Sequence, residues 1–215
     1  GSFAINFRVV FQLGPVYVLF KAVMVEEKDG KHLIVGVNNI NDRIRREQEY
    51  VSKLTAARNE ANRDALTGVK NKHAYIDVEA QIDRMIEENN APEFAVVVLD
   101  INDLKLTNDT LGHQAGDELI KTGCDIMCRI FRHCPVFRVG GDEFAIIAQG
   151  GDYKNIDILM RLLEESNMSN INSRGVVIAA GMCRYRNEKR VSDVFEKADI
   201  AMYENKRRLK ELKEI

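Results

Sequence analysis

Gly-Gly-Asp-Glu-Phe, at residues 140–144, joins two short apolar runs and decides how the surrounding chain folds. Residues 135–139 (PVFRV) precede it and residues 144–148 (FAIIA) follow it. Two strand-like runs joined at Gly140 and Gly141 predict a β-hairpin, because glycine supplies the positive φ of tight hairpin turns. Adjacent carboxylates repel each other unless a cation or a hydrogen-bond donor compensates them. This turn is therefore either an ordinary polar hairpin tip or half of a cation site.

A second acidic position lies upstream, at the end of a continuous apolar run. Residues 94–99 (FAVVVL) predict a strand buried on both faces, and Asp100 follows directly. Ligands usually bind where the strands of an open sheet end. If the hairpin pairs beside this strand, Asp100 and Asp142 meet at one edge, and a few hard oxygen ligands with substrate phosphates suit Mg²⁺. The alternative for Asp100 is a cap on the turn or helix that follows.

The rest of the chain alternates between helical and strand periodicity. Apolar spacing predicts helices at 71–90, 115–132, 153–167 and 191–210, a helical turn near 107–112, and strands at 94–100, 135–148 and 175–185. This order predicts an α/β fold, an α+β sandwich in which helices surround a central, mainly antiparallel sheet.

The N-terminal part has a different pattern. Residues 3–40 are β-rich, with a strand at 16–25, a turn at Asp29-Gly30 and a returning strand at 31–37. Three strands are too few for an independent core. The sheet therefore needs cover from a dimer partner, or it packs as an extra hairpin on the main domain.

Residues 41–63 are highly charged and contain no Gly or Pro, which predicts a helix. Apolar positions at heptad spacing form one seam along it: Ile40, Ile44, Val51, Leu54 and Ala61. Glu47 and Arg58 interrupt this seam. The helix is either a short coiled coil that carries a signal or an ordinary surface helix.

Several strings, in order, resemble motifs of the GGDEF family of diguanylate cyclases. They are DALTGVKNK at 64–72, DINDLKLTND at 100–109, GH and GD at 112–113 and 116–117, RVGGDEF at 138–144, and ADIAMY with a lysine at 198–206. The resemblance covers about residues 60–210. It implies a fold similar to the palm of nucleotide cyclases and polymerases, and an enzyme that condenses two GTP into cyclic di-GMP and pyrophosphate.

The resemblance also implies a metal site and a dimer. Asp100 and Asp142 would be the side-chain ligands of Mg²⁺, or of Mn²⁺, and Ile101 would lend its backbone carbonyl. Glu143 would bind metal or help to deprotonate the attacking hydroxyl, and Lys105 would assist catalysis at the phosphates. Each domain holds one GTP, so two copies must meet as a homodimer.

Guanine recognition is assigned in the same way to Asn108 and Asp117. A carboxylate accepts hydrogen bonds from guanine N1–H and N2–H₂, which adenine cannot reproduce, so Asp117 favours GTP. The alternative for Asn108 and Asp117 is capping of the helices near 107–112 and 115. Leu104, Gly140 and Gly141 would complete the substrate pocket.

Phosphate contacts are expected from Lys206 and Lys210, whose alternative is a solvated surface charge. Lys210 stands where the family often has Arg, and lysine lacks the planar bidentate fork. The family's product-inhibition motif R-x-x-D would begin at 131, where the chain reads Phe-Arg-His-Cys. We therefore expect no feedback inhibition at that site.

The domains follow from these motifs. Residues 3–40 resemble the last strands of a PAS sensor domain, 41–63 form a helical linker, and 64–215 form the cyclase domain. Gly1-Ser2 resembles a tag remnant, so we expect a longer protein with an upstream sensor region. We expect a cytoplasmic catalytic domain, whose full-length protein is either soluble or membrane-anchored upstream.

Composition limits the remaining classes. The formal net charge is −2 over 215 residues, and without a basic stripe we expect no nucleic-acid partner. The four cysteines predict reduced thiols, since Cys124 and Cys128 have no second pair at zinc-like spacing. The main rival to the cyclase is a catalytically silent GTP-binding module for signalling or dimerisation.

Overall fold

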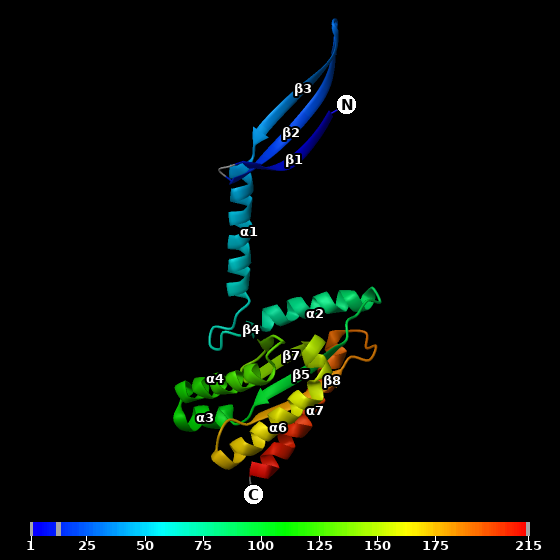
Figure 1. Ribbon diagram of the computed structural model, residues 1–215. Coiled ribbons are helices and arrows are strands. Elements are labelled where there is room, and N and C mark those ends of the chain that lie inside the picture. Colours follow the sequence, from blue (N-terminus) through cyan, green and yellow to red (C-terminus); the bar gives the residue numbers. More distant parts are fainter. Residues whose placement is uncertain (1, 12–13, 214–215) are drawn as a thin grey trace. The chain divides into compact units, whose positions relative to one another are not determined.

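The computed structural model describes residues 2–11 and 14–213, which form two compact units, Gly1–Ala61 and Asn62–Ile215 (Figure 1). The last two residues of the predicted domain 64–215 lie outside the described part. The boundary between the units falls within three residues of the predicted start of that domain.

The first unit is an antiparallel sheet followed by a helix. The strands β1 (Ser2–Phe11), β2 (Gly14–Glu27) and β3 (Gly30–Asn39) lie in the order β1-β2-β3. Gly30 opens β3 with φ of 140°, a conformation that favours glycine at this turn. The two strands expected at 16–25 and 31–37 are confirmed, and both are longer than their apolar runs.

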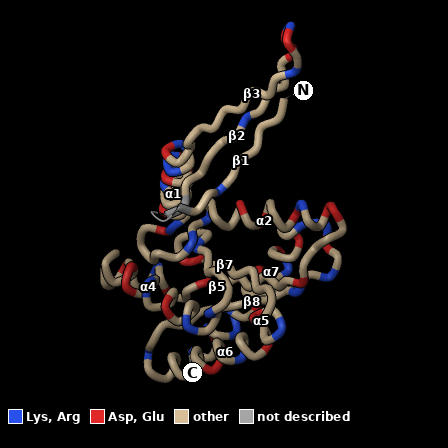
Figure 2. Tube along the Cα trace, turned by 45° about the horizontal axis from the view of Figure 1, so that its top comes forward, with Lys and Arg blue, Asp and Glu red and all other residues tan. Residues whose placement is uncertain are grey.

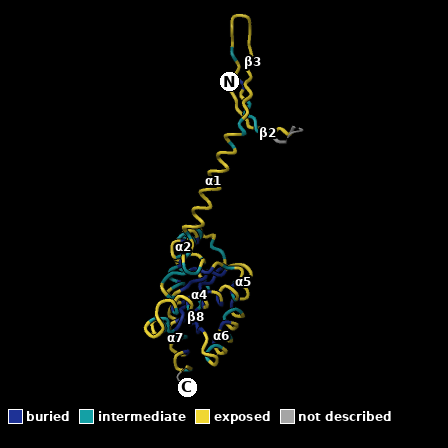
Figure 3. The backbone as a smooth tube through the Cα atoms, turned by 90° about the vertical axis from the view of Figure 1, so that its left-hand side faces the viewer, coloured by how far each residue is buried: buried dark blue, intermediate teal, exposed yellow. Residues whose placement is uncertain are grey.

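One face of this sheet is apolar and exposed. In the register of β1 with β2, Phe3 lies opposite Ala22 and Phe7 lies opposite Val18, and Phe20 contacts both phenylalanines at 6.4 and 6.3 Å between ring centroids. The same face continues into β3, where Val35 lies opposite Ala22. Among the described residues of Gly1–Ala61, Ala22 alone is buried, so this unit holds no core of its own (Figure 3).

The helix α1 (Asn41–Ala61) begins directly after β3. The backbone N–H of Ile40 donates to the Tyr17 carbonyl at 2.9 Å, and the Asn41 side chain accepts from the Tyr17 N–H at 2.6 Å. No residue of α1 is buried, and Val51 and Leu54 on the predicted seam are exposed. Both alternatives for this helix, coiled coil and surface helix, stay open.

The second unit is a five-stranded sheet in the order β4-β6-β7-β5-β8. Its strands are β4 (Lys70–Asn71), β5 (Phe94–Ile101), β6 (Val136–Arg138), β7 (Glu143–Gln149) and β8 (Ile178–Arg184). Only β4 and β6 pair in parallel, so the predicted mainly antiparallel sheet is confirmed. The apolar strand β5 lies between β7 and β8.

Helices cover both faces of this sheet. They are α2 (Lys72–Glu87), α3 (Leu104–Leu111), α4 (His113–Ile130), α5 (Gly150–Lys154), α6 (Ile156–Ser173) and α7 (Val191–Lys213). Successive residues of a strand point to opposite faces. Val97 and Leu99 of β5 accordingly pack with α4 and α6, whereas Val96 and Val98 pack with α2 and α7. Every residue of β5 is therefore buried, as its sequence predicts.

Several element boundaries differ from expectation. The short helix begins at Leu104 rather than near 107, and the segment expected as one helix at 153–167 forms α5 and α6, with Asn155 between them. The capping alternative for Asn108 and Asp117 is wrong, because both lie inside helices, beyond the N-cap positions of Asp103 and Gly112. Apolar periodicity shows that a helix is present, but the residues at which the helix begins and ends depend on tertiary contacts.

Charges of both signs are distributed along α1 and the helices of the second unit (Figure 2). Within residues 2–11 and 14–213, no helix combines the length and apolar character needed to cross a membrane.

Candidate functional site

The site forms where β5 ends beside the start of β7. Pairing of these antiparallel strands places Asp100 opposite Glu143, and the Ile101 N–H donates to the Asp142 carbonyl at 3.0 Å. The hairpin of β6 and β7 thus lies next to the apolar strand, which is the condition that the sequence analysis set for Asp100 and Asp142 to meet. The register brings the acidic residues of both motifs to the same end of the paired strands β5 and β7.

The hairpin turn contradicts one detail of the prediction. Positive φ occurs at Gly30, Gly68, Gly112 and Gly150, and not at Gly140 or Gly141. Glycine at 140 instead makes room for Glu143, whose carboxylate would lie 2.6 Å from an added Cβ. The Glu143 carbonyl accepts from the N–H groups of Val139 and Gly140, at 3.0 and 3.2 Å. The backbone at Gly140 is therefore not left-handed, and the Glu143 side chain lies close to it.

Arg138 stabilises the turn by hydrogen bonds to the Gly141 carbonyl and to Asp64, and we call this arrangement the brace. Its guanidinium donates to the Gly141 carbonyl through Nε at 3.2 Å and Nη2 at 2.8 Å, and through Nη1 to Asp64 at 3.0 Å. Asp64 also accepts from the backbone N–H and the hydroxyl of Thr67, at 2.9 and 2.7 Å. The first and fourth motifs of the sequence are therefore joined by one chain of hydrogen bonds. Sequence analysis assigned no role to Arg138 or Asp64, and their only signal was membership of the motif strings.

The electrostatics of this brace favour an ionised Asp64. Partial burial raises the pKa of Asp64, but hydrogen bonds from Thr67 and Arg138 outweigh burial, so the pKa lies below its ordinary value. The carboxylate is held charged at neutral pH, and its pairing with Arg138 is maintained there.

Asp100 is the buried acid of the site. Its side chain is 7% exposed, and its Oδ1 lies 2.6 Å from the ammonium of Lys206 on α7, its sole partner among the described residues. Burial raises the pKa of Asp100, Lys206 opposes this rise, and the carboxylates of Asp142 and Glu143 add to it. The carboxylates of Asp100, Asp142 and Glu143 are the ligand type that suits a hard divalent cation, but their oxygens do not all lie within 4.8 Å of one another.

A groove of about 390 Å³ opens beside these acids. Its lining brings together predicted site residues from three elements: Leu104 and Lys105 of α3, Asp142 of the turn, and Lys206 and Lys210 of α7. The same groove is also lined by Asp103, Leu106 and Asp109, which sequence analysis did not select. A groove with three lysines near a carboxylate cluster can hold an anion and a cation side by side.

Asn108 and Asp117 lie outside the groove, close to Gly116. An added Cβ at Gly116 would lie 1.9 Å from Asn108 Oδ1, so the Asn108 side chain lies directly over the residue that precedes Asp117. Asp117 is exposed and Asn108 is half-buried. Neither residue lines the groove itself, and they stand together where α3 meets α4.

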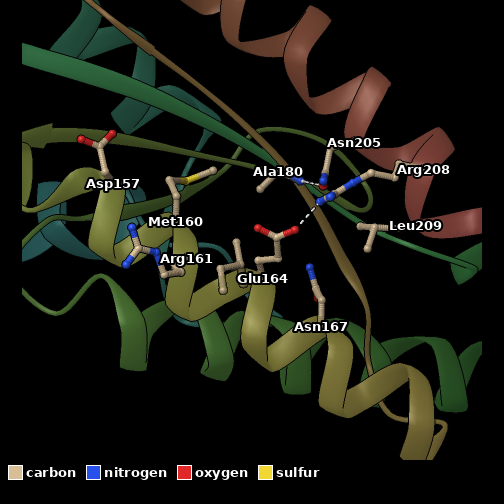
Figure 4. A pocket seen from close by; sticks show the side chains of 10 residues that line it. Asp157, Met160, Arg161, Glu164, Asn167, Ala180, Asn205, Arg208 and Leu209 are labelled. Carbon is tan, nitrogen blue, oxygen red and sulfur yellow. Dashed lines mark hydrogen bonds and ion pairs between the residues drawn. The ribbon is translucent and has the colours of Figure 1, made fainter. Parts of the chain in front are cut away.

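The position of the two α7 lysines depends on how α7 docks on β8. An added Cβ at Gly181 would lie 2.1 Å from the Met202 nitrogen and 2.2 Å from the Ala198 carbonyl oxygen, so helix and strand backbones touch. Asn205, next to Lys206, accepts from the Ala180 N–H at 3.0 Å. Arg208 pairs with Glu164 of α6, as Figure 4 shows. These contacts, which sequence analysis missed, fix the helix that supplies Lys206.

A second cavity, of about 280 Å³, lies between α6, β8 and α7 (Figure 4). None of the residues predicted for substrate or metal lines it. The carboxylates and lysines of the predicted site therefore mark the groove at the end of β5.

Comparison with known proteins gives one family. Residues 61–211 match the family described as diguanylate cyclase, GGDEF domain. The diguanylate cyclase DgcS of Shewanella oneidensis is 30% identical over 146 residues, which cover 66% of this chain and 49% of that protein. DgcZ of Escherichia coli (strain K12), also a diguanylate cyclase, is 30% identical over 152 residues, covering 68% and 50%.

A phosphodiesterase is also similar. The cyclic di-GMP phosphodiesterase PdeR of Escherichia coli (strain K12) is 32% identical over 161 residues, which cover 66% of this chain and 23% of that protein. The chain thus spans about half the length, or less, of these three relatives.

Solved structures share the fold. The coiled coil and GGDEF domain of DgcB from Caulobacter crescentus, in complex with c-di-GMP, aligns with a TM-score of 0.63 at 26% identity, covering 78% of this chain and 92% of that one. The GGDEF domain of DgcB alone, also with c-di-GMP, aligns with a TM-score of 0.57 at 28% identity, covering 68% and 91%. The predicted fold class is confirmed, whereas the PAS-like reading of residues 3–40 stays a prediction.

Proposed function

Since this chain belongs to the GGDEF domain family of diguanylate cyclases, we propose that it condenses two GTP into cyclic di-GMP and pyrophosphate. One observation carries this proposal above all. Asp100 and Asp142, which belong to separate motifs, lie side by side at the end of β5, next to a groove lined with lysines. A reaction between two nucleotides needs both a cation site and phosphate contacts, and the groove offers the residues for each.

The carboxylates of Asp100 and Asp142 and the carbonyl of Ile101 would hold Mg²⁺, with Mn²⁺ as the alternative. Among the described residues, the buried Asp100 oxygen has only the Lys206 ammonium as a partner, and a bound phosphate would offer that ammonium another partner, which supports this assignment. When bound, a divalent ion supplies charge neutralisation for the phosphates and lowers the pKa of the attacking hydroxyl.

The chain's own side chains would position the triphosphate and the base. Lys206 and Lys210, one turn apart on α7, and Lys105 on α3 face the groove and would contact phosphate oxygens. Asp117 would accept from guanine N1–H and N2–H₂, and Asn108 would hydrogen-bond the same edge, with Leu104 packing beside it. Gly141 leaves open space at the turn, since an added Cβ would meet nothing within 4 Å.

Catalysis would require two copies. With one nucleotide held per domain, the 3′-hydroxyl of one GTP attacks the α-phosphate of the other, a P–O bond forms, and pyrophosphate leaves in line. Glu143, exposed at the turn, would accept the hydroxyl proton or contact the metal. As in phosphoryl transfer generally, the protein acts by positioning and electrostatics.

The homodimer would form through α1. Its exposed seam of Val51 and Leu54 offers a helix-to-helix contact, and the similar DgcB structure is described as a coiled coil with its GGDEF domain. A signal upstream would act by favouring one arrangement of the paired helices over another.

A second function, a GTP-binding module without turnover, also has an observation in its favour. Lys206 pairs with Asp100 at 2.6 Å and so neutralises the acid that a metal would need. The similarity to PdeR is consistent with a domain of this kind occurring in a protein named for another activity, that of a cyclic di-GMP phosphodiesterase.

The two functions separate in one experiment. The protein is incubated with GTP and Mg²⁺ beside an Asp142→Ala variant, and products are identified by mass spectrometry. Cyclic di-GMP from the wild type alone supports the cyclase. GTP binding by calorimetry without product, including in a fusion to a dimeric partner, supports the silent module instead.

A further inference from the structure

The sheet of the first unit has one face that is apolar on all of its strands. Residues that lie directly opposite each other on neighbouring strands share a face, so the register of β1 with β2 and of β2 with β3 defines that face. We call it the apolar face, and it consists of Phe3, Ile5, Phe7 and Val9 of β1, Val16, Val18, Phe20, Ala22 and Met24 of β2, and Leu33, Val35 and Val37 of β3. The proposed function uses none of these side chains.

The opposite face of the same sheet has a different composition. It carries Asn6, Arg8 and Lys21 among its apolar residues. On the apolar face, charges appear only at the turn between β2 and β3, where Glu26 lies opposite Lys31. An antiparallel sheet with one polar and one apolar face normally packs its apolar side on another layer, so this pattern indicates that the apolar face is buried in an assembly.

The apolar face is exposed in the single chain. Phe3, Leu33 and Val37 are 57%, 55% and 62% exposed, respectively. Since a whole aromatic side chain presents about 150–250 Å² and an aliphatic one less, the face exposes on the order of 700 Å² of apolar surface. The largest apolar patch on a typical monomer is roughly 300–600 Å², and each partner of a stable complex contributes about 800 Å². The area of this face therefore fits what a stable dimer needs.

We propose that the apolar face packs against the same face of a second copy, so that the two sheets form a sandwich in the homodimer. Face-to-face sheets lie about 10 Å apart with their strands aligned to within about 30°, and a contact between identical faces is closed by a twofold axis. This contact would join the two copies that the proposed function requires, and it rests on the proposed function for that role. The pairing itself is measured without nucleotide.

The direction of α1 selects one of two ways to stack the faces. The Ile40 N–H donates to the Tyr17 carbonyl at 2.9 Å, and the Asn41 side chain accepts from the Tyr17 N–H at 2.6 Å, so α1 begins at one end of the sheet. A twofold axis parallel to the strands brings these ends together, whereas an axis across the strands separates them. Only the parallel axis lets Val51 and Leu54 of both copies meet, so one axis serves the sheet contact and the seam of α1.

The sizes of the side chains fit the parallel axis as well. Under this axis β2 lies over the partner's β2, and β1 lies over the partner's β3. The phenylalanines of β1, Phe3 and Phe7, would then face the smaller aliphatic side chains of β3. Layers in which large residues oppose smaller ones interdigitate, whereas an axis across the strands would stack the aromatic strand on itself.

The pairing is tested by sedimentation velocity on the whole chain without nucleotide. We expect a dimer, and Val37→Lys should raise its dissociation constant roughly a hundredfold, because a symmetric contact buries two unpaired ammonium groups. Ile34→Lys is the matched control, since Ile34 is on the same strand and similarly exposed, at 60%, but lies on the opposite face. The control should change the dissociation constant less than about twofold. A monomeric wild type, or equal losses in the two variants, would overturn the proposal.

A second measurement covers the case in which Val37→Lys unfolds the sheet. Phe3→p-benzoylphenylalanine keeps an aromatic side chain on the apolar face, and Val23→p-benzoylphenylalanine puts the same probe on the opposite face. After irradiation of a mixture of ¹⁵N-labelled and unlabelled chains, we expect mixed-isotope cross-links from residue 3 to residues 33–37 and none from residue 23.

Two other occupants of the apolar face are outcomes of this cross-linking experiment. Cross-links from residue 3 to residues 62–215 within one chain would show that the sheet packs on its own main domain. The absence of any cross-link from residue 3 would leave the face to a segment or partner outside this chain. Either result would overturn the proposal.

This inference and the proposed function can fail separately. A dimer that is lost in Val37→Lys but makes no cyclic di-GMP from GTP and Mg²⁺ would contradict the proposed function and leave the sheet contact in place. Cyclic di-GMP synthesis by a Val37→Lys protein that is still fully dimeric would refute the sheet contact and leave the proposed function intact.

Discussion

The two units of this chain differ in the burial of their apolar strand residues. In Gly1–Ala61 the sheet presents Phe3, Val35 and Val37 to solvent, and Ala22 alone is buried among the described residues. In Asn62–Ile215 every residue of β5 is buried between two layers of helices. The difference teaches that an apolar strand pattern specifies a core only when the same chain supplies both layers that cover it.

The contrast also separates a unit suited to chemistry from a unit suited to association. The second unit contains its own core and all of the predicted metal and substrate residues. The first unit contains exposed apolar surface on its sheet and on α1, which is a surface for association rather than for chemistry. Four changes test whether the two roles are divided in this way.

The largest effect is expected at Asp142. Asp142→Asn removes a charged oxygen ligand, and we expect cyclic di-GMP synthesis to fall by about a thousandfold or more, since a metal site supplies several kcal/mol of charge stabilisation. The melting temperature should change little, because the side chain is partly exposed at a turn. Synthesis close to the wild-type rate would exclude Asp142 as a ligand.

The next effect is on folding, at the contact of β8 with α7. Gly181→Ala places a Cβ within about 2.1 Å of backbone atoms of α7, and we expect a loss of about 3 kcal/mol in the free energy of unfolding, measured by urea denaturation. Gly36→Ala in β3 is the matched control, since its Cβ would meet nothing within 4 Å. Equal stability losses in both variants would contradict the division between a packed and an unpacked unit.

A smaller effect is expected on the seam of α1. Val51→Glu with Leu54→Glu should weaken self-association, seen by sedimentation, and lower turnover roughly tenfold at a fixed protein concentration, which corresponds to about 1.4 kcal/mol. Both side chains are exposed within the unit, so its thermal unfolding should not change. Full activity in a monomeric variant would argue against catalysis across a dimer and favour the surface-helix alternative.

The smallest effect concerns the brace at Asp64. Its folded pKa lies below the ordinary value of 3.8, so ionised Asp64 contributes stability above that value, and the contribution is lost as the pH falls through the folded pKa. We expect Asp64→Asn to cost about 1 kcal/mol at pH 7 and progressively less below pH 3.8. A difference from wild type that stays constant from pH 7 to pH 3 would show that the charge of Asp64 is not involved.

Much of the second unit was predictable from local patterns. The run FAVVVL at 94–99 predicts a buried strand because β-branched residues without polar alternation suit a strand covered on both faces. The hairpin around residues 140–141 followed from two short runs and their glycines, although the reason given for Gly140 was wrong. Helix ends at α3 and α5 were missed because local periodicity does not encode the contacts that stop a helix.

The sequence by itself indicated which residues carry the chemistry that the proposed function needs, the acids of two motifs and the lysines of α3 and α7, and it indicated the seam of α1 as a candidate for association. Only the tertiary structure decided that Arg138 reaches Asp64 and that Asn205 anchors α7. Strand pairing and close approach depend on backbone register between segments far apart in the chain. A local pattern cannot specify that register, because it arises from packing the whole unit.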